Sequence, residues 1–258
     1  MSSSNFIQNT FSLQGKNALV TGGNSGLGYS FAKALALAGA NVFIPSISDD
    51  TNSVVAEFQS YGVKSSYLKV DITKRGSAKQ ILSKMLEEFG SLDILVNNAG
   101  ICKINDVQEF DRDDWDPMVD VNLTAAFELI HEASKYMIPQ KSGKVINICS
   151  LFSYLGGLGS PAYAATKHGI AGLTKAYCDE LAQYNIQVNG IAPGYYATDI
   201  TKQTRENKET NKKVLDHIPA NRWGEVEDLM GSVVFLASKA SDYVNGHIIT
   251  VDGGYLVR

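Results

Sequence analysis

The sequence predicts an α/β protein with a doubly wound parallel sheet between two layers of helices. Two observations lead to this prediction. The chain has 258 residues and a hydrophobic content of 44%, which suits one large domain over residues 1–258. Seven short apolar runs alternate with stretches of helical periodicity, which is the pattern of strands buried on both faces by crossover helices. We therefore expect a three-layer αβα architecture.

The expected strands follow one another from residue 16 onward, without an internal repeat or a long linker. Helices are expected between most of them, and in residues 74–89 the apolar side chains fall on one side of a helix. Residues 1–13 are expected to form a loose arm. The apolar runs that predict strands are residues 17–21, 41–44, 67–70, 94–97, 144–148, 186–191 and 247–251.

Residues 198–217 break this alternation, because they are highly polar and rich in both charges. Such a composition suits a solvated surface helix. It also suits a small lid over a binding site, because the segment follows a glycine-containing loop at the end of an expected strand. Both interpretations stay open, and we call residues 198–217 the lid segment.

Composition and charge exclude several classes of protein. The net charge is -4 and no basic block is present, which disfavours nucleic acid and anionic membranes as partners. The three cysteines have no metal-ligand spacing, and so sparse a count fits a reducing compartment. We see no signal-peptide pattern and no apolar run of membrane-spanning length. These features predict a soluble cytoplasmic protein without a metal site.

A glycine-rich turn joins the first expected strand to a helical run over residues 29–38. Its sequence is TGGNSGLG, residues 21–28. Glycines let the backbone approach a phosphate closely, and the N-terminus of the following helix offers free N–H groups and a positive dipole. Strand, turn and helix stand in the order that a dinucleotide site needs. We expect the pyrophosphate to bind at Gly22, Asn24, Ser25, Gly26, Leu27 and Gly28.

Two further strand ends belong to the same expected site, because ligands bind at the carboxyl ends of strands in such sheets. Asp71 follows the third expected strand, next to Ile72, and can accept a hydrogen bond from an adenine amino group. The fourth strand leads into Asn98, Ala99 and Gly100, whose small size permits close approach of a ribose.

The choice between NAD and NADP depends on the end of the second strand. A carboxylate there binds the ribose 2′-OH, whereas an arginine binds a 2′-phosphate. Ser46 occupies this position and decides little, no arginine or lysine is near it in the sequence, and Asp49 and Asp50 would repel a phosphate. The sequence therefore favours NAD over NADP.

Tyr163 and Lys167 stand four residues apart, thirteen residues after Ser150. On a helix this spacing places both side chains on one face. A lysine ammonium beside a phenol stabilises the phenolate and lowers the tyrosine pKa from its ordinary value. Such a phenol can exchange a proton with an alcohol or ketone. The spacing alone is also common on solvated helix faces, so it needs the rest of the chain to support it.

The motifs together resemble the short-chain dehydrogenase/reductase family over residues 13–258. They occur in the family's order: TGGNSGLG at 21–28, NNAG at 97–100, Asn122, Ser150, YAATK at 163–167, and Pro193-Gly194. The resemblance implies a Rossmann-type fold and an oxidoreductase acting on CH–OH groups with a nicotinamide cofactor. The family commonly forms tetramers through its fourth and fifth helices, here residues 123–136 and 162–184.

The resemblance also implies roles for residues of this chain. Tyr163 would be the general acid/base, and Lys167 would lower its pKa and bind the nicotinamide ribose. Ser150 would hydrogen-bond the reacting oxygen, and Asn122 would hold a water that relays protons from Lys167. The residues that would contact the nicotinamide carboxamide are Pro193, Gly194 and Thr198.

Three segments, Ala192–Tyr195, Arg222–Gly224 and the ending Val251–Arg258, resemble the pattern of sugar-acid dehydrogenases. The closest resemblance is to 2-dehydro-3-deoxy-D-gluconate 5-dehydrogenase, also described as 2-deoxy-D-gluconate 3-dehydrogenase. This implies reduction of 3-deoxy-D-glycero-2,5-hexodiulosonate to 2-keto-3-deoxy-D-gluconate in uronate catabolism. A carboxylate substrate needs a cation. Lys103, after the fourth strand, and Arg205, in the lid segment, are the candidates, although either also fits a solvated surface charge.

Three alternatives remain. The first is a gluconate 5-dehydrogenase. The second is a 3-oxoacyl-carrier-protein reductase, which would normally use NADPH and carry a basic docking patch. The third is a non-catalytic nucleotide-sensing regulator, but such proteins typically lose the tyrosine or the lysine, and this chain keeps Tyr163 and Lys167.

Overall fold

A seven-stranded parallel sheet forms the centre of the computed structural model, which describes residues 3–49, 52–199 and 201–258. The strand order is β3-β2-β1-β4-β5-β6-β7, and every neighbouring pair is parallel. The order reverses between β1 and β4, and in such sheets ligands bind beside that switch point. The strands are β1 Asn17–Val20, β2 Asn41–Ser46, β3 Ser65–Lys69, β4 Ile94–Asn97, β5 Gly143–Ile148, β6 Ile186–Pro193 and β7 Ile248–Val251.

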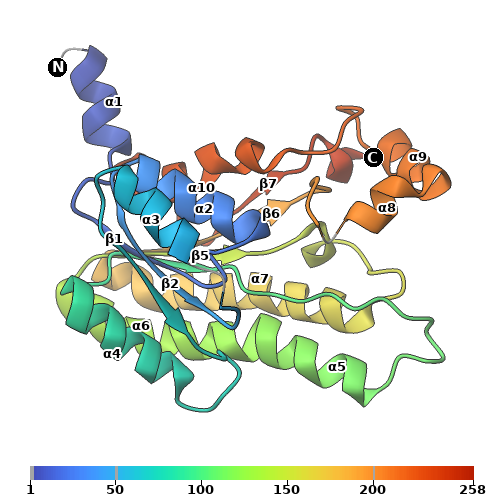
Figure 1. Cartoon of the computed structure of the whole chain (residues 1–258), viewed down its shortest axis with the longest axis horizontal. Coiled ribbons are helices and arrows are strands. Elements are labelled where there is room, and N and C mark those ends of the chain that lie inside the picture. The colour runs from blue at the N-terminus through green and yellow to red at the C-terminus, as the bar shows by residue number, and fades with distance from the viewer. Residues whose placement is uncertain (1–2, 50–51, 200) are drawn as a thin grey trace.

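Helices cover both faces of the sheet (Figure 1). Within each strand, alternate residues join opposite cores: Ala18 and Val20 belong to one apolar cluster, and Leu19 belongs to the other. One face carries α2 Gly26–Leu37, α3 Asn52–Ser60 and α10 Met230–Ala237. The other carries α4 Ser77–Phe89, α5 Arg112–Val119, α6 Ala125–Gln140 and α7 Pro161–Leu181.

The predicted α/β fold is confirmed, and each of the seven apolar runs forms a strand. The boundaries differ by a few residues, as where β2 continues to Ser46 and β6 to Pro193. The helix expected from residue 74 begins only at Ser77. Gly76 precedes it with a φ of 88°, a left-handed conformation that lies outside the helical region.

The segment expected to be a loose N-terminal arm contains a helix. Ser3–Phe11 form helix α1, which projects from the body of the molecule (Figure 1). Behind it Leu13 is buried, and its N–H donates to the carbonyl of Ala38 at 2.9 Å. Phe6 and Ile7 remain exposed on α1.

The lid segment folds into two short helices, α8 Lys202–Glu206 and α9 Lys208–His217. Asn207 caps α9, because its side-chain oxygen accepts from the N–H groups of Glu209 and Thr210 at 3.1 Å each. Both helices lie close to the C-terminus of the chain (Figure 1). The remaining short elements are η1 Asp120–Thr124, η2 Leu151–Ser153, η3 Ala182–Tyr184, η4 Val226–Leu229, η5 Lys239–Ser241 and η6 Tyr255–Val257. Within the described residues, every helix is too short or too polar to cross a membrane.

Candidate active site

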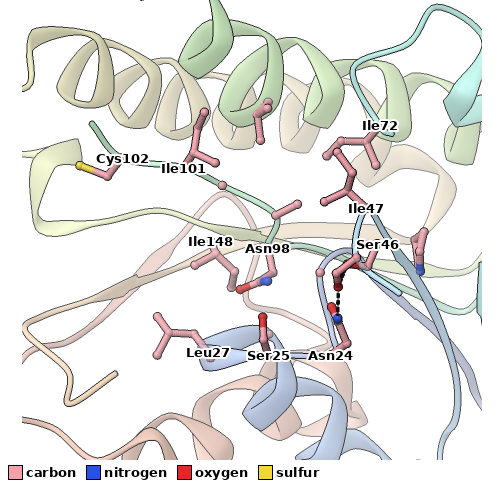
Figure 2. Close-up of a pocket in the computed structure, with 18 of the residues that line it drawn as sticks. Asn24, Ser25, Leu27, Ser46, Ile47, Ile72, Asn98, Ile101, Cys102 and Ile148 are labelled. Atoms are coloured by element: carbon pink, nitrogen blue, oxygen red, sulfur yellow. Dashed lines mark hydrogen bonds between the residues drawn. The ribbon is translucent and has the colours of Figure 1, made fainter. Parts of the chain in front are cut away.

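A cavity of about 530 Å³ opens at the carboxyl ends of the strands, where the sequence places the cofactor (Figure 2). Its lining includes every residue expected to contact the cofactor except Thr198. The residues come from separate strand ends: Asn24 and Ser25 follow β1, Ser46 ends β2, and Asn98 follows β4. The sheet therefore gathers motifs that are far apart in the sequence into one pocket.

The glycine-rich turn has the geometry of a phosphate cradle. Gly22 and Gly26 have φ values of 63° and 53°, which favour glycine. A Cβ on Gly28 would lie 2.2 Å from the carbonyl oxygen of Gly22 and 2.3 Å from Nδ2 of Asn98, so the position has no room for a side chain. Ser25, at the N-cap of α2, makes no capping hydrogen bond with its side chain. The residues present thus fit a pyrophosphate held by backbone N–H groups.

The adenosine end of the pocket is lined in part by small polar groups, and a cation that lies outside the lining is paired with one of them. Nδ2 of Asn24 donates to Oγ of Ser48 at 2.6 Å, and Oγ of Ser46 lies 3.5 Å from the same hydroxyl. No lysine is near Ser46 in the sequence, but strand pairing sets Lys69 opposite it. The ammonium of Lys69 lies 2.5 Å from Oδ1 of Asp49. Residue 50, also named in the cofactor prediction, lies outside the described residues.

Asp71 is held as a carboxylate at the end of β3. Its Oδ1 accepts hydrogen bonds from the N–H of Thr73 at 3.0 Å and from Oγ1 of Thr73 at 2.7 Å. These bonds are the main reason that the pKa of Asp71 is lowered, and Lys74 lowers it further. Asp71 lines the cavity in the ionised form that an adenine amino group needs as an acceptor.

The structure brings Tyr163, Lys167 and Ser150 together. The first two lie one turn apart on α7, and the Lys167 ammonium is 5.4 Å from the centroid of the Tyr163 ring. That ammonium also donates to the carbonyl of Ile148 at 2.7 Å, which ties it to the end of β5. Ser150 follows β5 and hydrogen-bonds the Tyr163 side chain. All three line the cavity.

Burial controls the proton affinities of the pair. It raises the pKa of Tyr163 to about 12, and the hydrogen bond with Ser150 offsets only part of that rise. It lowers the pKa of Lys167 to about 8. The expected lowering of the tyrosine pKa by Lys167 is therefore not seen in this structure, because the loss of solvation is the larger effect. At neutral pH Tyr163 is a neutral phenol and Lys167 a cation.

Asn122 lies in a single turn of π-helix, η1, and its side chain hydrogen-bonds the residues that surround the pocket. Its Oδ1 accepts from the N–H of Ile101 at 2.8 Å. Its Nδ2 donates to the carbonyl of Ile101 at 2.9 Å and to Oγ1 of Thr166 at 3.3 Å. The side chain is buried behind the pocket wall, where it joins the loop after β4 to helix α7, next to Lys167.

Four of the predicted site residues lie outside the cavity lining, namely Asn122, Thr198, Lys103 and Arg205. Lys103 forms an ion pair with Asp114, a carboxylate with only 3% of its side chain exposed. Arg205 donates from Nη2 to the carbonyl of Thr198 at 2.9 Å, within the lid segment. Their roles with substrate or cofactor stay predictions.

Some pocket residues were not singled out from the sequence. Ile47 and Ser48 follow Ser46, Ile101 follows Gly100, and Cys149 precedes Ser150. Each adjoins a residue that was predicted, so adjacency to a strand end was a usable signal. Cys102 also lines the cavity on the side of the catalytic residues. Among the described residues, no group of three or more His, Cys, Asp or Glu side chains is arranged to hold a metal.

Comparison with known proteins agrees with this geometry. A family model described as enoyl-(acyl carrier protein) reductase matches residues 22–256. The 2-dehydro-3-deoxy-D-gluconate 5-dehydrogenase of Escherichia coli is 44% identical over 253 residues, which are 98% of this chain and 100% of that protein. The chain belongs to the short-chain dehydrogenase/reductase family. It is therefore an oxidoreductase with a nicotinamide dinucleotide as cofactor.

Two further relatives bear on the chemistry of this member of the family. An Escherichia coli protein named uncharacterized oxidoreductase YgcW is 68% identical over 253 residues, 98% of this chain and 97% of that one. A solved structure of a gluconate 5-dehydrogenase from Burkholderia cenocepacia, in complex with NADP and tartrate, has a TM-score of 0.93 and 36% identity, and the match covers 98% of this chain and 99% of that one. The two relatives above that carry an assigned activity are named for sugar acids.

Proposed function

We propose that this protein reduces a ketone of a sugar acid, with 3-deoxy-D-glycero-2,5-hexodiulosonate as substrate and 2-keto-3-deoxy-D-gluconate as product. The observation that carries the proposal is the neutral Tyr163 phenol, hydrogen-bonded to Ser150 and one helical turn from the Lys167 cation. A reductase needs a proton donor and a polarising donor at one carbonyl oxygen, and this arrangement supplies both.

The side chains act as follows. Tyr163 donates its proton to the carbonyl oxygen as that oxygen becomes a hydroxyl, and Ser150 stabilises the negative charge that develops there. Lys167 then stabilises the phenolate, and its pKa of about 8 keeps it charged at neutral pH. Asn122 places the backbone of Ile101 at the pocket wall and offers the position of a proton-relaying water. When bound, the reduced nicotinamide supplies the hydride.

The substrate class is supported by the relatives, and one alternative has support of its own. Proteins named 2-dehydro-3-deoxy-D-gluconate 5-dehydrogenase from three bacteria are 43% to 44% identical to this chain over 253 residues each. A protein of Escherichia coli named 5-keto-D-gluconate 5-reductase is 40% identical over 252 residues. Reduction of 5-keto-D-gluconate is therefore the second candidate activity.

We further propose that NAD(H) is preferred over NADP(H), although solved relatives carry NADP. The Ser46 and Ser48 hydroxyls suit a ribose 2′-OH, and Asp49 neutralises the nearby Lys69. In Asp49→Asn this neutralisation is lost, so kcat/KM with NADPH should rise at least about fivefold relative to NADH, as for one ion pair. Lys69→Met in the same background should remove the gain. A wild-type preference for NADPH would contradict the proposal.

The substrate proposal is tested with purified protein and both reduced cofactors. Rates are measured by the loss of nicotinamide absorbance with 3-deoxy-D-glycero-2,5-hexodiulosonate, 5-keto-D-gluconate and a 3-oxoacyl thioester. We expect the first to have the highest kcat/KM. A higher value for 5-keto-D-gluconate would select the second candidate, and a higher value for the thioester would overturn the assignment to sugar acids.

We also propose that the protein is a cytoplasmic homotetramer associated through α6 and α7. On α6, Phe127 is 45% exposed and stacks on His131 with ring centroids 6.1 Å apart, which leaves aromatic surface for a partner. Light scattering of the purified protein tests the assembly, and a monomeric mass would refute it.

A further inference from the structure

A cluster of aromatic rings lies directly beyond the catalytic pocket. Tyr195 follows Gly194, a residue of the cavity lining. Its ring centroid is 5.6 Å from that of Trp223, edge to face, and 5.2 Å from that of Tyr255. The ring of His217 lies 4.2 Å from that of Tyr255. Offset and edge-to-face pairs at these separations are attractive.

The cluster joins three parts of the chain that are distant in sequence. Tyr195 belongs to the loop after β6, His217 ends helix α9 of the lid segment, and Tyr255 begins η6 in the C-terminal tail. Tyr195 directly follows Gly194 of the cavity lining, and burial first, then Tyr255, raises its pKa to about 12. The rings thus connect the pocket wall, the lid segment and the tail.

Two hydrogen bonds attach α9 to the same neighbours. Nε1 of Trp223 donates to Oδ1 of Asn211 at 2.7 Å, and Nη1 of Arg258 donates to the carbonyl of Asp216 at 3.1 Å. Helices α8 and α9 contain no buried residue of their own. A segment with so little burial has a low free energy of local unfolding, so each of these contacts is a large part of what holds it.

Local hydrogen bonds give the C-terminal tail a defined turn. Asp252 accepts from the N–H of Gly254 at 2.8 Å and from the N–H of Leu256 at 2.9 Å. Gly254 has a φ of 89°, which turns the chain into η6. Tyr255 is therefore presented to His217 from a hydrogen-bonded turn, whereas α9 buries no residue of its own.

We propose that Tyr255 and Trp223 are positioning residues that hold the lid segment against the substrate side of the catalytic pocket. Tyr255 acts through the His217 and Tyr195 rings, and Trp223 acts through the Asn211 hydrogen bond. The part of this inference that concerns a sugar acid rests on the proposed function. The part that concerns the lid segment does not.

The first test is limited trypsin digestion of the full-length protein, because the lid segment contains Lys202, Arg205, Lys208, Lys212 and Lys213. Tyr255→Leu and Trp223→Phe should each raise the rate of cleavage within residues 202–213 by about threefold to tenfold, the factor that one aromatic contact or hydrogen bond supplies. Tyr255→Phe, which keeps the ring, should change it less than Tyr255→Leu. Mass spectrometry identifies the cut.

Matched controls use aromatic residues that take no part in the cluster. Tyr243 is fully exposed, and Tyr243→Leu should leave the cleavage rate unchanged. Trp115→Phe repeats the chemical change of Trp223→Phe on helix α5. Equal cleavage of the cluster variants and these controls would overturn the inference.

The second test separates positioning from general damage. Tyr255→Leu should raise KM for the sugar acid about threefold to tenfold, while the Kd for the reduced cofactor changes less than about twofold, since α9 supplies no residue to the cavity lining that holds the expected cofactor contacts. A parallel loss of cofactor affinity would overturn the positioning role. If trypsin cleaves the lid segment faster in the variants but even the wild type turns over no sugar acid, the positioning role of Tyr255 and Trp223 stands. The proposed substrate class then fails.

Discussion

The nucleotide end and the substrate end of the pocket are held in different ways. At the nucleotide end, Oγ1 of Thr21 accepts from the backbone N–H groups of Asn98 and Ala99 at 3.0 Å each, which ties β1 to the end of β4. The strands there are buried throughout. At the substrate end, α8 and α9 bury no residue and depend on a few side-chain contacts. We call the nucleotide end the sheet-built end, because paired strands position its residues. We call the substrate end the loop-built end, because contacts between loops and short helices position its residues.

This difference predicts which property of the enzyme a substitution at each end should change. Changes at the sheet-built end should disturb chemistry and cofactor binding, because the backbone itself forms the site. Changes at the loop-built end should alter substrate affinity while chemistry and cofactor binding persist, because they shift a local opening equilibrium. The predictions below test that division, from the largest expected effect to the smallest.

Tyr163→Phe should have the largest effect. It removes the proton donor and leaves the ring in its T-shaped contact with Phe152, whose centroid is 5.8 Å away. We expect kcat to fall by about two to four orders of magnitude, the usual range for a general acid. Cofactor Kd, measured by fluorescence titration, should stay within about twofold. Turnover near that of the wild type would remove Tyr163 from the mechanism.

Gly28→Ala should damage the sheet-built end next. The added Cβ would meet the carbonyl oxygen of Gly22 at 2.2 Å, so the turn must move. We expect the free energy of unfolding to fall by about 1–3 kcal/mol, as in overpacked sites, and cofactor Kd to rise about tenfold or more. Gly172→Ala on α7 is the matched control, because nothing lies within 4 Å of its Cβ. If both variants behave alike, the turn does not have the close packing described.

The same division explains what the sequence could predict. Each β-strand leaves a local apolar run, and the i, i+4 spacing of Tyr163 and Lys167 is local too, so the strands and the juxtaposition of these two side chains could be predicted. The pairing of Lys69 with Asp49 depends on strand register, and that of Lys103 with Asp114 depends on the path of a loop. No short-range pattern in the sequence connects the two partners of such a contact. The raised pKa of Tyr163 was missed for a similar reason, because burial depends on the whole pocket.

Lys167 provides a test through pH. Its pKa is about 8 in the folded protein against 10.5 ordinarily, so between these values the unfolded chain holds more protons and stability rises with pH. Tyr163 acts oppositely above pH 10, where the folded protein keeps a proton that the unfolded chain loses. Between about pH 8 and 10 the stability of wild type relative to Lys167→Met should therefore rise, as measured by denaturant unfolding. A flat difference over that window would show that the ammonium is well solvated.

Lys103→Ala should give the smallest effect and bears on the loop-built end. The Lys103 side chain is 60% exposed although it pairs with Asp114, so a substrate carboxylate can compete for it. We expect KM for the sugar acid to rise about fivefold to tenfold, as for one charge-assisted hydrogen bond, with KM for a neutral ketone unchanged. Lys84→Ala on α4, which also removes an exposed ion-paired lysine, is the control. An equal rise for both substrates would mean that Lys103 only holds its loop through Asp114, and the carboxylate would then have to be bound by other groups of the loop-built end.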